Sequence, residues 1–197
     1  MGSPETEIPD SEWIRRVQQG EQEAFEPLLE RHQRRVFSLV YHLVRRRDEV
    51  EDIAQEIFIK AFRGIRSYNF QASFGTWLSR IAVNHCYDYL RREQKAKLSY
   101  YWQIGEEGSR AIEGQAQSTS EGALSLEQES EARELAEKLL ARAPAQDRTI
   151  LVLKELEDHS VEEIAAILRL RPNTVKVRLH RARKRMLEDW KRWRQKR

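Results

Sequence analysis

The sequence predicts an all-α fold: two small helical domains joined by a flexible acidic linker, with a helix-turn-helix in the second. Apolar residues recur at helical spacing through both halves, and no alternation of apolar and polar residues is long enough to predict a strand. Eight glycines and five prolines in 197 residues are too few for a many-turned β architecture. We expect domains at residues 10–95 and 128–197, with the linker at 96–127.

The first half of the predicted N-terminal domain contains two helices. Asp10 or Ser11 can cap the first, which ends near Gly20. The second covers residues 25–43, where apolar residues follow the i, i+3, i+4 spacing of an amphipathic helix.

Two further helices complete this domain. The third begins near Asp48 and places Ile53, Ile57 and Ala61 along one apolar stripe. After a break at residues 67–73, a fourth helical pattern begins at Phe74 and ends around Arg92.

Charge is distributed unevenly along the chain. The formal net charge is only +3. Residues 97–131 nevertheless carry a net charge of about −5, and residues 169–197 one of about +11. Because the acidic stretch has few large apolar residues, it cannot bury enough surface to fold. The basic end has the polarity of an element that faces nucleic acid.

The predicted C-terminal domain contains four helical patterns. Leucines at 135, 139 and 140 mark the first, which stops at Pro144, and residues 150–156 mark the second. Residues 160–163 read Ser-Val-Glu-Glu, a capping box that opens a short third helix. After a turn at 169–171, Pro172 suits the first position of the last helix.

The last two helices form a predicted helix-turn-helix, whose second helix enters the major groove of DNA. With Val175, Leu179 and Ala182 packed inward, basic side chains remain on the outer and flanking faces. Such side chains bind guanine edges and phosphates. The alternative is a basic surface helix that closes a small bundle. The candidate DNA contacts are Thr174, Lys176, Val177, Arg178, His180, Arg181, Lys184 and Arg185.

Residues 160–165 and 174–183 together resemble the C-terminal domain of extracytoplasmic-function (ECF) sigma factors, small members of the bacterial sigma-70 family. The resemblance implies that this domain recognises the −35 promoter element. Two departures are visible: Arg171 replaces a frequent serine, and Asp158-His159 replaces a more usual glycine-hydrophobic pair.

Residues 52–62 resemble the sigma helix that binds core RNA polymerase. The spacing alone indicates that the polar side of this helix is an ordinary solvated face. The resemblance makes Asp52, Gln55 and Glu56 the candidate polymerase contacts, and carboxylates with an amide suit a basic, hydrogen-bonding partner.

Residues 74–84 resemble the segment that melts promoters and reads the −10 element. Aromatic rings can stack on single-stranded bases while cations follow the backbone, although each ring is equally consistent with a core residue. The loop at 67–73 is a candidate pocket for an extruded base. The candidate −10 contacts are Tyr68, Asn69, Phe70, Trp77, Arg80, Asn84, Asp88 and Arg91.

No pattern predicts an enzyme, a cofactor or a metal site. Adjacent residues such as His85 and Cys86 point about 100° apart on a helix, so they are poorly placed as base and nucleophile. A conventional helix-turn-helix regulator and a structural helical adaptor remain alternatives. The order of the three sigma-like segments favours the sigma factor.

The expected partners are core RNA polymerase and promoter DNA, both as duplex and as melted strand. The resemblance also allows an anti-sigma factor, although no residue identifies one. A polar start, a single cysteine and no long apolar run predict a cytoplasmic protein without membrane insertion.

Overall fold

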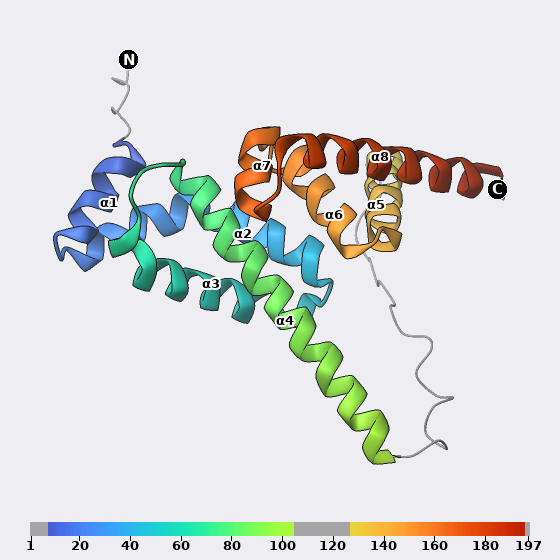
Figure 1. Cartoon of the computed structure of the whole chain (residues 1–197), viewed down its shortest axis with the longest axis horizontal. Helices are drawn as coiled ribbons and strands as arrows, with labels where there is room; N and C mark the ends of the chain where they lie inside the picture. Colours follow the sequence, from blue (N-terminus) through green and yellow to red (C-terminus); the bar gives the residue numbers. More distant parts are fainter. Residues whose placement is uncertain (1–7, 105–126, 196–197) are drawn as a thin grey trace.

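The computed structural model describes residues 8–104 and 127–195, and within these ranges the regular structure is entirely helical (Figure 1). The helices are α1 (Asp10–Gln18), α2 (Glu26–Val44), α3 (Val50–Gly64), α4 (Phe74–Ile104), α5 (Glu127–Arg142), α6 (Ala145–Leu151), α7 (Val161–Leu168) and α8 (Pro172–Gln195). Shorter turns are η1 (Gln22–Phe25), η2 (Arg47–Glu49), η3 (Ile65–Ser67) and the π-helical η5 (Val152–Leu156). The all-α prediction is confirmed.

Helices α1–α4 pack around one apolar core. The predicted stripe of α3 is buried, and Leu39 of α2 and Leu78 of α4 have essentially no exposed surface. Burying side chains of this size stabilises a fold by about 1.5–3 kcal/mol each. The helical periodicity therefore predicted the core of this half correctly.

The predicted cap of α1 was wrong. Pro9 occupies the N-cap position, and no side chain caps the helix. Asp10 instead lies in the first turn and turns towards α2, where its two oxygens contact Arg31 at 2.6 Å and His32 at 2.7 Å. Asp10 does not cap α1 because its carboxylate binds Arg31 and His32, more than 20 positions away in the sequence.

Helix α4 begins as expected but continues twelve residues past Arg92. Its start is fixed by Ser73, whose hydroxyl oxygen accepts a hydrogen bond from the Thr76 amide at 3.1 Å. The first nine residues of the linker predicted at 96–127 continue α4, and most of the rest, at residues 105–126, lies outside the described residues.

The capping box of α7 is confirmed. The Ser160 hydroxyl oxygen accepts from the Glu163 amide at 3.1 Å, and the Ser160 amide donates to the Glu163 carboxylate at 2.8 Å. The turn after α7 places Arg169 in the left-handed region at φ 54°, and α8 then begins at Pro172. The start of the helix-turn-helix and its central turn are therefore both determined by local chemistry.

Replacing Ser160 with alanine is expected to lower the stability of the full chain by about 1 kcal/mol, because one amide at the start of α7 loses its side-chain acceptor. Thermal unfolding followed by circular dichroism measures this loss. Ser67→Ala is the control, because that hydroxyl is exposed and bonds only to the nearby Gly64 carbonyl oxygen. Equal melting temperatures for the two variants would contradict the role of the cap.

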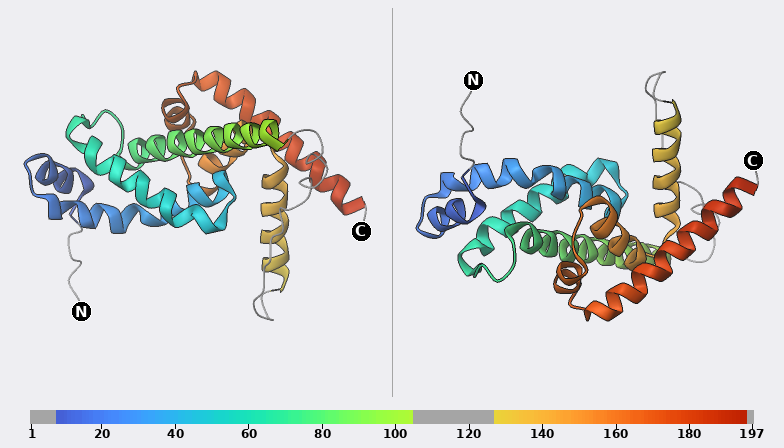
Figure 2. Two further views of the ribbon diagram at one scale, coloured as in Figure 1. Left: turned by 90° about the horizontal axis from the view of Figure 1, so that it is seen from below. Right: turned by 90° about the horizontal axis from the view of Figure 1, so that it is seen from above.

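The two helical groups lie against each other (Figures 1 and 2). Helix α7 packs on α4, while α6 and η5 pack on α2. Polar contacts cross this boundary: the Tyr87 hydroxyl donates to the Thr149 hydroxyl at 2.8 Å, and the Arg148 guanidinium donates to the Leu43 carbonyl at 3.4 Å. The sequence contained no signal for this arrangement.

Candidate nucleic-acid interface

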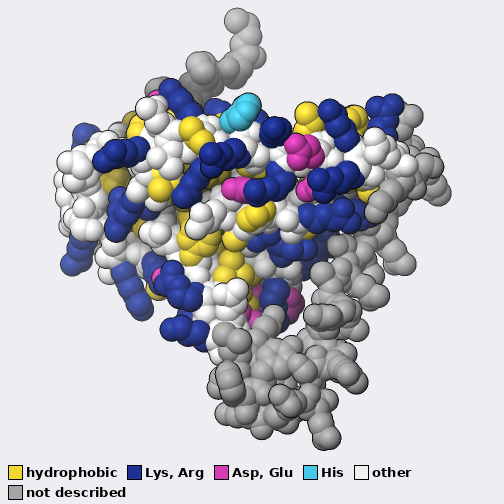
Figure 3. All heavy atoms as spheres, turned by 45° about the vertical axis from the view of Figure 1, so that its right-hand side comes forward, with side chains coloured by type: hydrophobic (Ala, Val, Ile, Leu, Met, Phe, Trp, Pro, Cys, Tyr) yellow, Lys and Arg dark blue, Asp and Glu magenta, His cyan; other side chains and the backbone are white. Residues whose placement is uncertain are grey.

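The outer face of α8 is basic and exposed. Val175, Leu179 and Ala182 are buried beneath it, as their spacing predicted. Lys and Arg side chains cover much of the face seen in Figure 3, to which α8 contributes. We define the outer face of α8 by its exposed predicted contacts other than Arg185, which pairs with α6: Lys176, Val177, His180, Arg181 and Lys184.

The other predicted contacts on α8 lie nearer the body of the domain. Arg178 donates to the Gln146 side-chain oxygen at 3.0 Å, and Arg185 forms an ion pair with Asp147. Both acceptors belong to the first turn of α6. Thr174 is half-buried. Arg178 and Arg185 are therefore tied to α6 in this structure, while about half of the Arg185 side chain (51%) remains exposed.

Four aromatic rings cluster beside the start of α4. Tyr68 lies 5.2 Å from Trp77, 6.0 Å from Phe74 and 4.9 Å from Phe70, between ring centroids. Tyr68 is buried, and its hydroxyl donates to the Ala72 carbonyl at 2.6 Å. Burial raises the pKa of this hydroxyl. Tyr68 thus supports the loop from inside, rather than presenting a free ring.

The rest of the loop faces outward. Phe70 is 41% exposed and has a left-handed backbone at φ 62°. Asn69 beside it is exposed, and Trp77 is half-buried. The Arg15 guanidinium lies 5.5 Å from the Phe70 ring centroid, close enough for a cation–π contact. An aromatic ring beside a cation is chemically suited to stacking with a nucleobase.

A polar line runs along α4 from this loop. Asn84, Asp88 and Arg91 are exposed and Arg80 is half-buried, at spacings of three or four residues. Asp88 and Arg91 form an ion pair at 3.3 Å. The predicted line is therefore present on one side of the helix, with a carboxylate that partly neutralises its basic end.

The predicted polymerase contacts lie on the exposed face of α3. Asp52, Gln55 and Glu56 are all exposed, above the buried stripe of this helix. Ile59 on the same face is 43% exposed, an apolar residue that the sequence reasoning did not select. Ile59 does not belong to the apolar stripe of α3, so helical periodicity alone could have predicted that this apolar side chain is exposed.

Glu56 also makes a contact within the chain that the sequence did not predict. Its carboxylate lies 3.2 Å from Nε2 of His85, and Nδ1 of the same ring lies 2.5 Å from Lys60 Nζ. Burial and the Lys60 charge lower the pKa of His85. His85 thus links α3 to α4 beneath the predicted polymerase surface.

Cys86 has the environment of a packed residue. Its side chain is fully buried, and burial raises the pKa of the thiol to about 12. A nucleophilic cysteine needs the opposite shift. Across residues 8–104 and 127–195, no cluster of three or more His, Cys, Asp or Glu is arranged to hold a metal ion. No helix in these ranges is long and apolar enough to cross a bilayer.

Family comparisons match both helical groups. Residues 28–96 match the model of sigma-70 region 2, and residues 133–186 match that of sigma-70 region 4. The first match contains the exposed face of α3 and the polar line of α4, and the second ends inside α8. Each covers the part of the chain that the sequence resemblance had indicated.

Curated relatives align over nearly the whole chain. The ECF RNA polymerase sigma factor SigW of Bacillus subtilis is 35% identical, covering 86% of this chain and 90% of its own length. The ECF RNA polymerase sigma-E factor of Escherichia coli is 35% identical, with 90% and 92% covered. The RNA polymerase sigma-H factor of Pseudomonas aeruginosa is 32% identical, again with 90% and 92% covered.

Solved structures share the fold. CnrH, in complex with the cytosolic domain of CnrY, has a TM-score of 0.65 and 20% identity, over 92% of this chain and 97% of that one. The sigma factor RpoE of Bartonella quintana, in complex with the anti-sigma factor NepR, also has a TM-score of 0.65, with 23% identity over 85% and 96%. From the two region matches and the full-length relatives together, the chain belongs to the ECF sigma factors of bacterial RNA polymerase.

Proposed function

We propose that this chain binds core RNA polymerase and directs promoter-specific initiation, with the outer face of α8 reading the −35 duplex. The observation that carries the proposal is that face: five predicted contacts stand exposed above a buried apolar stripe, on the second helix of a capped helix-turn-helix. Side chains presented in this way reach base edges and phosphates together.

The start of α4 and its preceding loop are proposed to read the −10 element. Phe70 and Asn69 supply an exposed ring and amide, and the polar line from Arg80 to Arg91 supplies partners for the strand backbone. In this proposal Tyr68 stabilises the conformation of the loop at 67–73. Stacking and backbone contacts of this kind suit a melted strand better than a duplex.

The exposed face of α3 is proposed to bind the polymerase through Asp52, Gln55 and Glu56. These side chains offer acceptors to a basic surface, and Ile59 adds an apolar centre to the patch. We therefore include Ile59 in the proposed contact. The proposed domains remain 10–95 and 128–197, joined by the predicted linker.

An anti-sigma factor is a proposed further partner, since RpoE was solved in complex with the anti-sigma factor NepR, and CnrH with the cytosolic domain of CnrY. In this proposal the chain is an initiation factor and performs no chemistry of its own. Because its partners are the polymerase and chromosomal promoters, its place of action is the cytoplasm.

Reconstituted transcription tests the function. Purified chain added to bacterial core polymerase is expected to start transcripts at one position on a cognate promoter, and to protect its −35 and −10 elements from nuclease. A promoter with both elements scrambled is the matched control. If the chain binds promoter duplex equally with and without core and starts no transcript, it is a conventional helix-turn-helix regulator instead.

A further inference from the structure

A buried histidine lies beneath the exposed face of α3 that is proposed to bind the polymerase. His85 belongs to α4 and is only 3% exposed. Its Nδ1 lies 2.5 Å from Lys60 Nζ, and its Nε2 lies 3.2 Å from a carboxylate oxygen of Glu56. Lys60 and Glu56 are both exposed residues of α3. One buried ring therefore contacts two charged side chains of the proposed polymerase surface.

The two partners of His85 determine where a neutral ring carries its proton. An ammonium group donates hydrogen bonds and accepts none, so Nδ1 is the acceptor in the contact with Lys60. In a neutral ring the proton then lies on Nε2, the nitrogen beside Glu56. The neutral ring thus offers each charged side chain the group that it can bind.

The contact between Nε2 and Glu56 has the distance of an ion pair but not the alignment of a hydrogen bond. Nε2 is buried and has no aligned hydrogen-bond partner, although the carboxylate lies within 3.2 Å. A buried N–H without an acceptor is unfavourable, so it favours conformations of Glu56 that keep the carboxylate beside it. The contact therefore restricts a side chain that is 60% exposed.

The spacing of the partners places both within the exposed patch of α3. Glu56 and Lys60 are four residues apart, so they lie one turn apart on the same side of the helix. Asp52 lies one further turn towards the start of α3, and Gln55 and Ile59 form the neighbouring row. His85 is thus positioned to order charged side chains of the patch from below.

We propose that His85 is a positioning residue of the polymerase surface, and that its neutral ring holds Glu56 and Lys60 in the conformations that core RNA polymerase binds. The proposal adds Lys60 to the polymerase contacts. It rests on the proposed function, because the order of these side chains matters only if the polymerase binds them. Binding then loses less conformational entropy, since two long side chains are ordered before the partner arrives.

Acid is expected to disrupt this arrangement. Burial and the Lys60 charge lower the pKa of His85, Glu56 raises it, and Arg92 and Asp88 of α4 act in opposite directions. A protonated ring has no acceptor for Lys60 and repels its ammonium group. Because the pKa lies below the ordinary value of about 6.5, the arrangement is complete above that pH and is lost as the pH falls through the lowered pKa.

NMR of the free chain with isotope-labelled histidine tests the contacts without the polymerase. We expect the His85 ring to carry its proton on Nε2 at pH 8. Lys60→Met should raise the pKa of His85, because it removes a nearby positive charge. Arg63→Met, on an exposed residue of the same helix, should leave this pKa unchanged. A proton on Nδ1, or equal pKa values in the two variants, would overturn the arrangement.

The affinity for core polymerase tests the positioning role. His85→Leu fills the same buried site but binds neither charged side chain. We expect it to weaken core binding about threefold to tenfold, because the polymerase must then order both side chains itself. His85→Gln should retain most of the affinity at neutral pH, because the introduced amide can accept from Lys60 and donate to Glu56.

Tyr89→Phe is the matched control for the leucine variant. It removes another buried polar atom from α4, but the carboxylates that act on this hydroxyl are those of Glu49 and Glu93. We expect unchanged core binding, and thermal unfolding checks that each variant is folded. If a folded His85→Leu chain binds core as tightly as Tyr89→Phe does, His85 is only a packing residue.

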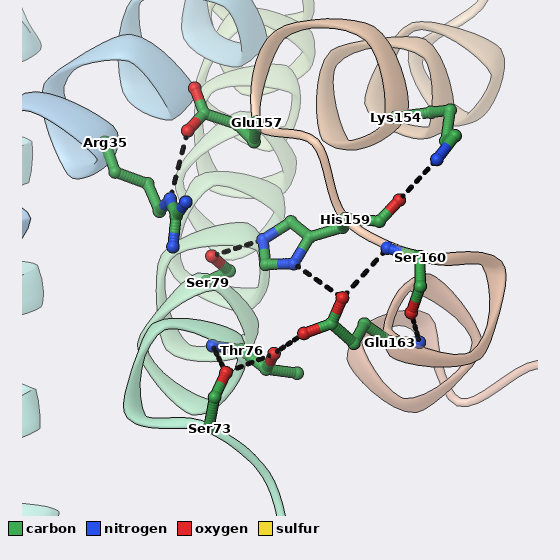
Figure 4. A network of polar contacts seen from close by, with 9 residues as sticks. All are labelled: Arg35, Ser73, Thr76, Ser79, Lys154, Glu157, His159, Ser160 and Glu163. Atoms are coloured by element: carbon green, nitrogen blue, oxygen red, sulfur yellow. Dashed lines mark hydrogen bonds and ion pairs between the residues drawn. The ribbon is translucent and has the colours of Figure 1, made fainter.

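The pH profile of core binding distinguishes positioning from packing. The unmodified chain should bind as tightly as His85→Gln above pH 6.5 and more weakly at lower pH, because the glutamine does not titrate. His159 is also buried with a lowered pKa, but it contacts Ser79 and Glu163 and is present in both chains, so its titration cancels in the ratio (Figure 4). A ratio that stays constant to one unit below the pKa measured by NMR would contradict the role of the neutral ring.

These measurements separate the positioning role from the function on which it rests. If NMR shows the expected proton position and pKa response but the unmodified chain does not bind core polymerase, the proposed function fails and the His85 contacts stand. If the unmodified chain binds core and a folded His85→Leu chain binds it equally, the function stands and the positioning role is wrong.

Discussion

Replacing Lys176 and Arg181 together with alanine is expected to lower the affinity of the holoenzyme for promoter duplex by about one to two orders of magnitude. Both side chains lie on the exposed outer face of α8. A specific base contact contributes about 1–3 kcal/mol, and each lost phosphate contact also reduces the dependence of binding on salt. Titration of labelled −35 duplex at several salt concentrations measures both effects.

Arg183→Ala is the matched control for that experiment. It removes the same charge from the same helix, but its guanidinium forms an ion pair with Glu155 at 2.7 Å, to one side of the outer face. We expect a much smaller loss of affinity. If the double variant and the control bind equally, or if the −35 footprint is unchanged, α8 does not read DNA through its outer face.

Changing Asp52, Gln55 and Glu56 together to alanine is expected to weaken binding to core RNA polymerase at least tenfold. The three side chains form the polar part of an exposed patch, and losing hydrogen-bonded carboxylates at the centre of an interface raises the rate of dissociation. Fluorescence titration of labelled chain with core polymerase measures the affinity.

Glu51→Ala supplies the control for the polymerase surface, because Glu51 is an exposed carboxylate on the same helix outside the predicted set. Thermal unfolding of the triple variant checks that α3 still packs, since Glu56 also contacts His85. A folded triple variant that binds core as tightly as Glu51→Ala would show that the polymerase uses another surface.

Features that depend on neighbours in the chain were predictable from sequence. Ser160 and Glu163 are three residues apart, so their reciprocal capping is readable as a motif. The buried stripe of α3 follows from helical periodicity in the same way. The family resemblance made exposed residues such as Asp52 candidate polymerase contacts. From periodicity alone, the same residues form an ordinary solvated face.

Features that depend on distant partners were not predictable. Asp10 looked like a cap but binds α2, and nothing in the sequence indicated that the predicted DNA contacts Arg178 and Arg185 also reach the first turn of α6. His159 carried no signal beyond its departure from the family pattern, although it lies 80 positions from its partner Ser79. Such pairings arise only when the helices pack, so no local rule contains them.

The length of α4 has a mechanical consequence. Its 31 residues extend about 46 Å at the rise of an α-helix, and the twelve beyond Arg92 account for about 18 Å of this. The connection to the second domain therefore departs from the tip of a stiff lever rather than from the surface of the bundle. Removing one turn of this lever is expected to move that point of departure by about 5.4 Å along the helix axis, so the length of α4 sets where the connection begins.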